Sequence, residues 1–225
     1  MEISENELKL RWLKKRKAIY TLKDNLERLK YKVTKDLNSD NEKEKLLATI
    51  VRIMMNTSER VGNKGSSKNG RFGVSQFRKK HVKVSGSLVE LSYVGKSGVE
   101  HNKVFKDAKV ANILKQKKDE KGIYLFCTTT GLKISPEMVN RYLAVYDITS
   151  KDIRGFNANN MVVKELRKKG PVKEVKERKK LFNEILTKIA EKIGHTKATL
   201  RGQYLLPEIE ESFYATGKVS NRIKI

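Results

Sequence analysis

The spacing of apolar residues changes twice along this chain, and that change constrains the fold more than any other feature. From residue 5 to about residue 57, apolar side chains recur every three or four residues, which is the period of an α-helix. Between residues 81 and 105 the pattern becomes short β-like runs separated by glycine and serine. Beyond residue 107 the helical period returns. The chain is therefore predicted to be a mainly helical α+β protein with one small antiparallel β-sheet or hairpin region near residues 72–106.

The first helical stretch is expected to contain two helices. The polar run LNSDNEKEK interrupts the period, and Ser39 or Asp40 has a side chain suited to cap the second helix. The exposed faces of the first helix are dense with lysine, which is typical of a linker. We therefore expect a helical arm or linker at residues 1–45 and the main domain at residues 46–225.

The carboxyl-terminal half is predicted to be mostly helical. Ser135 followed by proline is a common helix start, and Gly194 is a common helix end. The expected helices cover residues 107–116, 135–146, 149–169 and 175–194, with a short helix over residues 195–206 that Pro207 ends. The run YLFCTTT at residues 124–130 is expected to be a buried strand.

The excess of positive charge indicates a polyanionic partner. Fifty Lys and Arg oppose 26 Asp and Glu, which gives a formal net charge of +24. Such a surplus is typical of proteins that bind nucleic acid, although a merely soluble basic surface or an anionic membrane surface would also account for it. No apolar run approaches the ~20 residues of a membrane span, so we expect no membrane partner.

Cysteine content and the amino end point to an intracellular protein of the cytoplasm or nucleoid. Cys127 is the only cysteine, so no disulfide framework can form within the chain. Its apolar neighbours favour a core thiol over a nucleophile. The first twenty residues lack the uninterrupted apolar stretch of a secretory signal.

The sequence shows no metal or nucleotide motif. It has no CxxC pair, no HExxH and no GxxxxGK[ST] loop, and its histidines are scattered at positions 81, 101 and 195. We therefore expect neither a metal nor another cofactor. Any chemistry must use side chains alone.

Residues of the types that phosphodiester chemistry needs lie far apart along the chain. They are Arg60, Lys96, Arg154, His195 and Tyr204. Arginine can hold two phosphoryl oxygens through its planar fork, and lysine can donate a proton as well as attract an oxygen. A phenol can attack phosphorus where its developing charge is stabilised. Taken singly, each residue also has an ordinary structural explanation, such as a surface ion pair, a helix cap or a half-buried core tyrosine.

The order of these residues along the chain and the short motifs around them are more specific than any one of the residues alone. The relevant segments are SERVGNK, FGVSQFRKKHVKVSGSLVELSYVGKSG, SKDIRGF and IGHTKATLRGQY, with nine residues from His195 to Tyr204. Together they cover roughly residues 45–206. The chain resembles the catalytic domain of type IB DNA topoisomerases, including the short poxviral and bacterial enzymes, which belong to the tyrosine recombinase/topoisomerase IB superfamily.

This resemblance implies an enzyme that relaxes supercoiled double-stranded DNA as a monomer, without ATP or metal. Tyr204 would attack one strand and form a 3′-phosphotyrosyl link, while Lys96 would protonate the departing 5′ oxygen. Arg60 and Arg154 would bind the nonbridging oxygens, and His195 would hydrogen-bond one of them. Residues 46–225 would be the catalytic domain. Residues 1–45 look helical and too short for the β-rich amino-terminal domain that family members usually carry.

A basic rim around this site is expected to contact DNA phosphates. The candidate residues are Lys64, Lys68, Arg71, Arg78, Lys79, Lys80 and Lys151. His81 is expected to support the sheet, and no role is assigned to His101.

Two other functions remain open from the sequence. Tyrosine recombinases share the nucleophile and the arginine pair, but they usually carry histidine three residues before the second arginine, where this chain has Lys151. The run TGLKISPE at residues 130–137 resembles a recombinase motif but has Lys133 in place of arginine, and we interpret it as a helix-capping turn. A noncatalytic DNA-binding protein of the same fold would also suit the charge.

Overall fold

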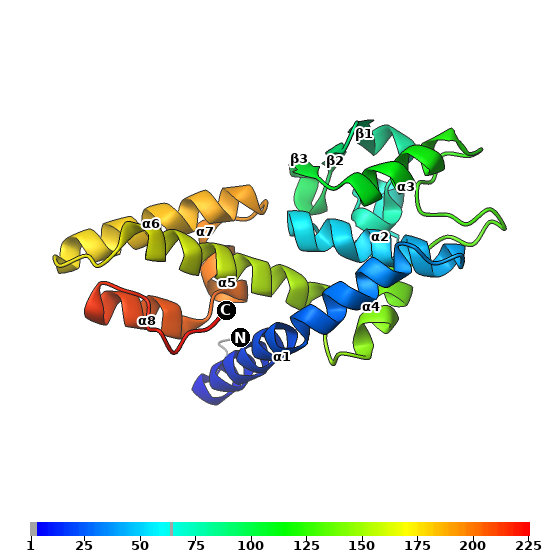
Figure 1. The fold of residues 1–225 in the computed structure, drawn as a ribbon. Coiled ribbons are helices and arrows are strands. Elements are labelled where there is room, and N and C mark those ends of the chain that lie inside the picture. Colours follow the sequence, from blue (N-terminus) through cyan, green and yellow to red (C-terminus); the bar gives the residue numbers. More distant parts are fainter. Residues whose placement is uncertain (1–3, 64) are drawn as a thin grey trace. The chain divides into compact units, whose positions relative to one another are not determined.

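The computed structural model describes residues 4–63 and 65–225, so the predicted DNA contact Lys64 lies outside the described residues. Contacts divide the chain into two compact units (Figure 1). The sheet unit is Asn25–Arg154, and the terminal unit combines Met1–Asp24 with Gly155–Ile225. The contact units do not follow the expected boundary at residue 45. That boundary separates a helical arm from the domain expected to carry the activity, and it stays a prediction.

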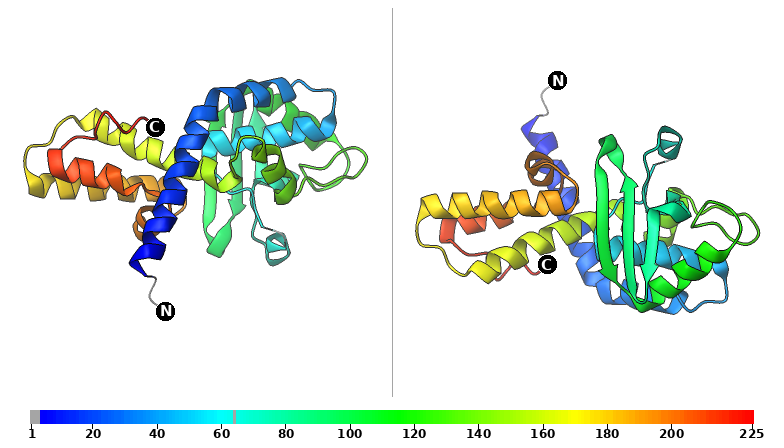
Figure 2. Two further views of the ribbon diagram at one scale, coloured as in Figure 1. Left: turned by 90° about the horizontal axis from the view of Figure 1, so that it is seen from below. Right: turned by 90° about the horizontal axis from the view of Figure 1, so that it is seen from above.

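The sheet unit contains the predicted antiparallel sheet. Its strands are β1 (Val82–Ser85), β2 (Leu88–Val94) and β3 (Glu100–Lys106), in the order β1-β2-β3. Alternate residues of β2 are buried and exposed, so one face of the sheet packs on the core and the other faces solvent. The helices α2 (Glu42–Thr57) and α3 (Ala108–Asp119) pack against the sheet (Figure 2). The mainly helical α+β prediction is confirmed.

Side-chain caps start the helices of the sheet unit. Asp107 caps α3, and Ser135 accepts a hydrogen bond from the Met138 N–H at the start of α4 (Pro136–Ala144). The TGLKISPE segment therefore includes the predicted capping residue. The predicted cap of α2 was wrong: Asn41, rather than Ser39 or Asp40, accepts from the Glu44 N–H at 3.2 Å. Ser39 instead accepts from the Asn41 N–H at 3.1 Å, one step earlier in the turn.

The segment at residues 124–130 is not a strand, contrary to the prediction. It makes only isolated bridges, between Arg78 and Tyr124 and between Cys127 and Lys133. Its backbone bonds alternate between two loops, with the Leu125 N–H donating to Phe77 O and the Phe126 carbonyl accepting from the Ile134 N–H. Each partner segment contributes only one isolated bridge, so the pairing does not extend into a ladder. Cys127 itself is half-buried.

The terminal unit is helical throughout its regular structure. Besides the amino-terminal part of α1 (Glu5–Asp36) and most of α5 (Ser150–Lys169), it contains α6 (Val175–Lys192), α7 (Lys197–Thr199), the π-helical η5 (Leu200–Tyr204) and α8 (Pro207–Thr216). Phe182, Leu186 and Phe213 are fully buried between α6 and α8. The predicted short helix thus divides into α7 and η5, and Pro207 occupies the first turn of α8.

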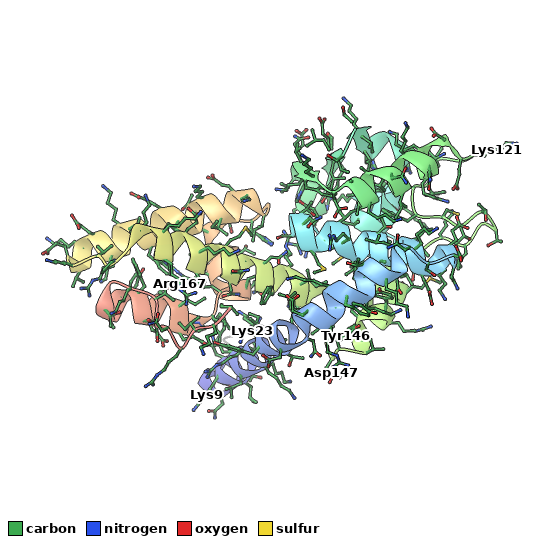
Figure 3. All side chains as sticks on the ribbon, viewed as in Figure 1. Lys9, Lys23, Lys121, Tyr146, Asp147 and Arg167 are labelled. Carbon is green, nitrogen blue, oxygen red and sulfur yellow. The ribbon has the colours of Figure 1, made fainter. Side chains whose placement is uncertain are left out.

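The described helices carry many exposed cations. Lys9 on α1 is one of them, and Lys121, in the loop that follows α3, is exposed as well (Figure 3). Within residues 4–63 and 65–225, no helix combines the length and apolarity needed to cross a membrane.

Candidate active site

The turn Ser58–Arg60 places the first candidate arginine. Helix α2 ends at Thr57, and Ser58 adopts a left-handed conformation whose N–H donates to Met54 O at 2.9 Å. The Arg60 carbonyl then accepts from the Val74 N–H at 2.8 Å, so the glycine-rich loop closes back on this turn. The closure is tight, because a Cβ on Gly73 would lie 2.2 Å from the backbone nitrogen of Gly62.

Arg154 lies at the beginning of α5 and belongs to the sheet unit. Its side chain is only 2% exposed, and its guanidinium donates to the Ser58 carbonyl. A surface ion pair is therefore not the explanation for this arginine. The charges of Arg154 and Arg60 both act on the pKa of the buried Tyr93 phenol, which places the two guanidiniums in one neighbourhood. Burial and the carboxylate of Glu59 nevertheless raise the pKa of Tyr93 above its ordinary value.

Lys96 lies in the connection between β2 and β3, as predicted. It begins the short 3₁₀ turn Lys96–Gly98, and the Gly95 N–H donates to Val99 O at 2.7 Å to close the hairpin. Ser97 and Gly98 both have positive φ, 63° and 76°. The Lys96 side chain is exposed at the hairpin tip.

His195 and Tyr204 lie together in the terminal unit. Their ring centroids are 4.9 Å apart, and Tyr204 is 5% exposed while His195 is half-buried. Gly194, with φ of 68°, ends α6, and the His195 N–H donates to Ala190 O at 2.8 Å. The Tyr204 carbonyl accepts from the buried Asn159 amide at 2.8 Å. The sequence spacing of nine residues therefore brings the imidazole and the phenol into contact.

The five candidate residues thus form two groups, each held within its own unit. Arg60, Lys96 and Arg154 belong to the sheet unit, and His195 and Tyr204 belong to the terminal unit. The first group has the cation types that can bind a phosphoryl group, and the second has a phenol next to an imidazole.

Comparison with known protein families identifies the family to which this chain belongs. A model described as the catalytic core of eukaryotic DNA topoisomerase I matches residues 9–212, which include both groups of candidate residues. The chain belongs to the DNA topoisomerase I family. The match begins within the expected arm at residues 1–45, so part of that arm corresponds to the family's catalytic core.

Two relatives carry the topoisomerase name. The chain is 25% identical over 207 residues to a DNA topoisomerase 1B of Acanthamoeba polyphaga mimivirus, covering 84% of this chain and 61% of the relative. It is 29% identical over 154 residues to a DNA topoisomerase 1 of Mycosarcoma maydis, covering 56% of this chain and 15% of the relative. The chain therefore spans less than two thirds of the length of either relative.

Among solved structures, a XerH site-specific recombinase bound to a palindromic difH substrate has a similar fold. The TM-score is 0.50 at 15% sequence identity, covering 79% of this chain and 46% of the recombinase. This likeness supports the topoisomerase/recombinase fold that the sequence predicted.

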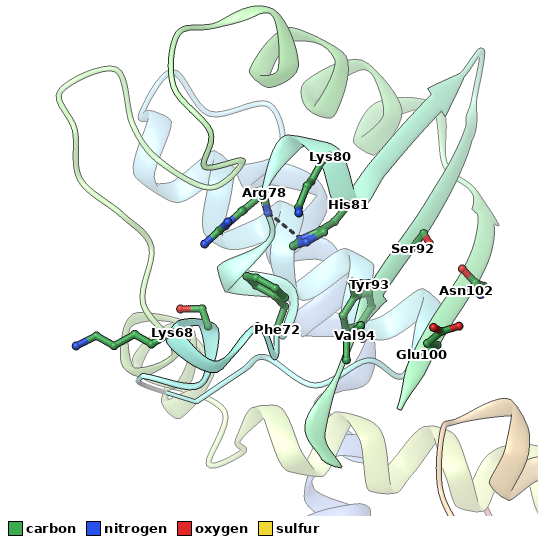
Figure 4. A pocket seen from close by; sticks show the side chains of 12 residues that line it. Lys68, Phe72, Arg78, Lys80, His81, Ser92, Tyr93, Val94, Glu100 and Asn102 are labelled. Carbon is green, nitrogen blue, oxygen red and sulfur yellow. Dashed lines mark hydrogen bonds between the residues drawn. The ribbon is translucent and has the colours of Figure 1, made fainter. Parts of the chain in front are cut away.

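In this topoisomerase-family chain, a groove of about 650 Å³ lies between residues 67–81 and the strands β2 and β3 (Figure 4). Its basic residues include three of the predicted DNA contacts, Lys68, Arg78 and Lys80. The Arg78 guanidinium lies 5.3 Å from the Phe72 ring centroid, and its Nε is buried with no hydrogen-bond partner among the described residues. The polar groups Ser92, Glu100 and Asn102 also line the groove.

The predicted phosphate contacts differ in their surroundings. Arg71 and Lys151 are exposed, as are Lys68 and Lys80 at the groove. The Lys79 ammonium instead donates to the Glu120 carbonyl, which turns its charge toward the end of α3. Lys79 is not among the residues that line the groove.

Two histidines of the sheet unit are buried. His81 packs against Phe72 and Phe77, and its Nδ1 accepts from the Arg78 N–H at 3.1 Å, in agreement with the expected structural role. Burial and the positive charges of Lys80 and Arg78 lower the pKa of His81 to about 4. His101 contacts the carboxylate of Glu59, a residue that the sequence analysis missed. The only signal in the sequence was an acid placed directly before Arg60.

Proposed function

We propose that this chain relaxes supercoiled DNA by cutting and resealing one strand through a 3′-phosphotyrosyl intermediate, without ATP or metal. The observation that carries the proposal is the family match over residues 9–212, which contains all five residues of the candidate site. The burial of Arg154 supports it, because a buried guanidinium beside a second arginine is preorganised to receive an anion.

The reaction assigns one role to each residue. The Tyr204 oxygen attacks phosphorus and loses its proton to solvent, and the bond from phosphorus to the 5′ oxygen breaks. Lys96 donates a proton to that oxygen, while Arg60 and Arg154 neutralise the nonbridging oxygens in the transition state. His195 hydrogen-bonds a nonbridging oxygen. The cut strand rotates about the intact one, and the 5′-hydroxyl then attacks the phosphotyrosine, which restores the DNA and frees Tyr204.

The proposal extends to the partner and the architecture. Double-stranded DNA is the substrate of a monomeric, intracellular enzyme, with residues 46–225 as the main catalytic domain and residues 1–45 as a helical arm, part of which the family's catalytic core also includes. The charge of +24 supports attraction of the polyanion. The expected phosphate contacts are Lys64, Lys68, Arg71, Arg78, Lys79, Lys80 and Lys151.

The decisive experiment compares the wild-type protein with Tyr204→Phe on supercoiled plasmid and on a 5′-labelled duplex. The wild type should relax the plasmid, and denaturant should trap protein covalently attached to the 3′ end of the labelled fragment. Tyr204→Phe should bind the plasmid yet neither relax it nor form the adduct. Relaxation by the variant at the wild-type rate, or a wild type that never forms the adduct, would refute the proposal.

A recombinase function is the second candidate, and the likeness to the XerH fold favours its inclusion. A strand-exchange assay between two labelled duplexes separates the functions, since a relaxing enzyme rejoins the original strands. Lys151, at the position where recombinases usually have histidine, supports the topoisomerase assignment.

A further inference from the structure

A fully buried acid lies beside the cationic part of the site. The Glu59 side chain has 0% exposure, and its carboxylate accepts a hydrogen bond from the Tyr93 hydroxyl. His101 Nδ1 lies 2.9 Å from one carboxylate oxygen, and the Lys103 ammonium lies 3.8 Å from the other. Burial raises the pKa of Glu59, but the hydrogen bonds of His101 and Tyr93 and the charges of His101 and Arg154 outweigh it and lower that pKa. The carboxylate is therefore ionised near neutral pH.

Two partners of Glu59 lie in the strands next to the β2–β3 turn. Tyr93 on β2 and His101 on β3 are directly paired across the two strands, and their rings stack with centroids 5.0 Å apart. The turn Lys96–Gly98 begins three residues after Tyr93. A Cβ on Gly95 would lie 2.7 Å from His101 Nε2, so this imidazole packs directly against the residue that precedes Lys96.

The backbone around Glu59 also reaches both arginines. The preceding carbonyl, that of Ser58, accepts from the Arg154 guanidinium, and the following residue is Arg60. All of these groups lie within the sheet unit. The turn Ser58–Arg60 is therefore linked to all three candidate cations. It contains Arg60, bonds to Arg154 through Ser58, and bonds through Glu59 to the strands that carry the Lys96 turn.

A buried carboxylate costs free energy unless strong partners compensate for its missing hydration. Here the compensation comes from hydrogen bonds that tie the end of α2 to the strands just below the Lys96 turn. Removal of the charge would weaken the interactions of Glu59 with His101 and Lys103. The exposed turn Lys96–Gly98 would then be held less rigidly by the ends of β2 and β3. Small displacements of a catalytic group suffice to slow a reaction, since a shift of about 1 Å can lower the rate ~10²-fold.

We propose that Glu59 is a positioning residue that, through Tyr93 and His101, holds the β2–β3 hairpin so that Lys96 can deliver its proton to the leaving oxygen. This inference rests on the proposed function, in which Lys96 is the general acid. Glu59 itself is not assigned a contact with DNA, because its carboxylate already bonds to Tyr93 and His101 and an anion would repel the phosphates.

The test uses Glu59→Gln, which keeps the size of the side chain and removes its charge. Two DNA duplexes are compared in single-turnover cleavage, one with an ordinary scissile phosphodiester and one with sulfur in the 5′ bridging position. A thiolate leaves without protonation, so the sulfur substrate bypasses Lys96. Glu59→Gln should slow cleavage of the ordinary duplex about 10–100-fold, and its cleavage of the sulfur duplex should approach the wild-type rate. Lys96→Ala should show the same pattern more strongly.

Glu90→Gln is the matched control, because Glu90 is an exposed acid on β2 and its replacement gives the same charge change. It should behave as wild type on both substrates. If Glu59→Gln folds poorly, Tyr93→Phe removes one hydroxyl from the same carboxylate and should give a smaller version of the same pattern.

Two outcomes overturn the inference: Glu59→Gln cleaves both duplexes at wild-type rates, or it is slowed equally on both. Equal slowing would mean that Glu59 supports the arginines or the fold rather than Lys96. Failure of the proposed function has a different signature, because the wild type would then form no covalent adduct with either duplex.

Discussion

Asn159 holds the backbone of Tyr204 through its side-chain amide. Its Nδ2 donates to the Tyr204 carbonyl at 2.8 Å, and its Oδ1 accepts from the Leu206 N–H at 2.8 Å. Nδ2 also donates to the Gly155 carbonyl at 2.8 Å, and the whole side chain is buried. One amide on α5 therefore fixes the end of the π-helical segment that carries the proposed nucleophile.

We expect Asn159→Ala to slow strand cleavage at least tenfold while leaving DNA affinity nearly unchanged. The substitution leaves the buried Tyr204 carbonyl and Leu206 N–H without the Asn159 amide, at a cost of about 1–3 kcal/mol for each unsatisfied group. Single-turnover cleavage and equilibrium binding would be measured together. Asn160→Ala, one position along the same helix and half-buried, is the control. Equal cleavage rates for the two variants would contradict the role of Asn159.

DNA binding should depend on salt through the groove cations. With Tyr204→Phe as background to prevent cleavage, neutralising Arg78 or Lys80 should reduce the slope of log affinity against log salt by about 0.9 for each phosphate that the protein no longer neutralises. Lys79→Ala should change the slope less, because its ammonium donates to the Glu120 carbonyl. A larger effect at Lys79 than at Arg78 would argue against the groove as the DNA surface.

The buried His81 should make stability depend on pH. Its folded-state pKa is about 4, below the ordinary value of 6.5, so the unfolded chain binds a proton first as pH falls. The contribution is fully present above pH 6.5 and declines between about 6.5 and 4, by up to about 3 kcal/mol. Urea unfolding of the wild type and His81→Asn across this range isolates the difference. Parallel pH profiles would show that His81 does not titrate in this way.

Gly73→Ala should destabilise the protein and displace the loop after Arg60. Its new Cβ would lie 2.2 Å from the Gly62 nitrogen, and backbone atoms cannot give way as a flexible side chain can. We expect a decrease of about 1–3 kcal/mol in the free energy of unfolding, typical of overpacking. Gly202→Ala, where a Cβ would meet nothing within 4 Å, should leave thermal stability unchanged or slightly raised. A similar melting temperature for both variants would refute the close approach at Gly73.

The amino-acid sequence by itself determined the local structure and the residue types for the proposed chemistry. The three strands, the hairpin around Lys96 and the helix ends at Ser135 and Gly194 follow from the period of apolar residues and from turn chemistry, which act over a few neighbouring positions. The sequence motifs around the five candidate residues are likewise short segments, and the family match includes all five residues.

The tertiary structure alone decided what surrounds those residues. The run at residues 124–130 has the composition of a strand, but its backbone groups bond to two separate loops and form no ladder. Glu59 and Asn159 carry no strong local signal, since Tyr93, His101, Tyr204 and Leu206, which they hold, lie 34 to 47 residues away along the chain. Such contacts depend on how distant segments pack, and burial then decides whether a polar side chain is solvated or holds its neighbours in place.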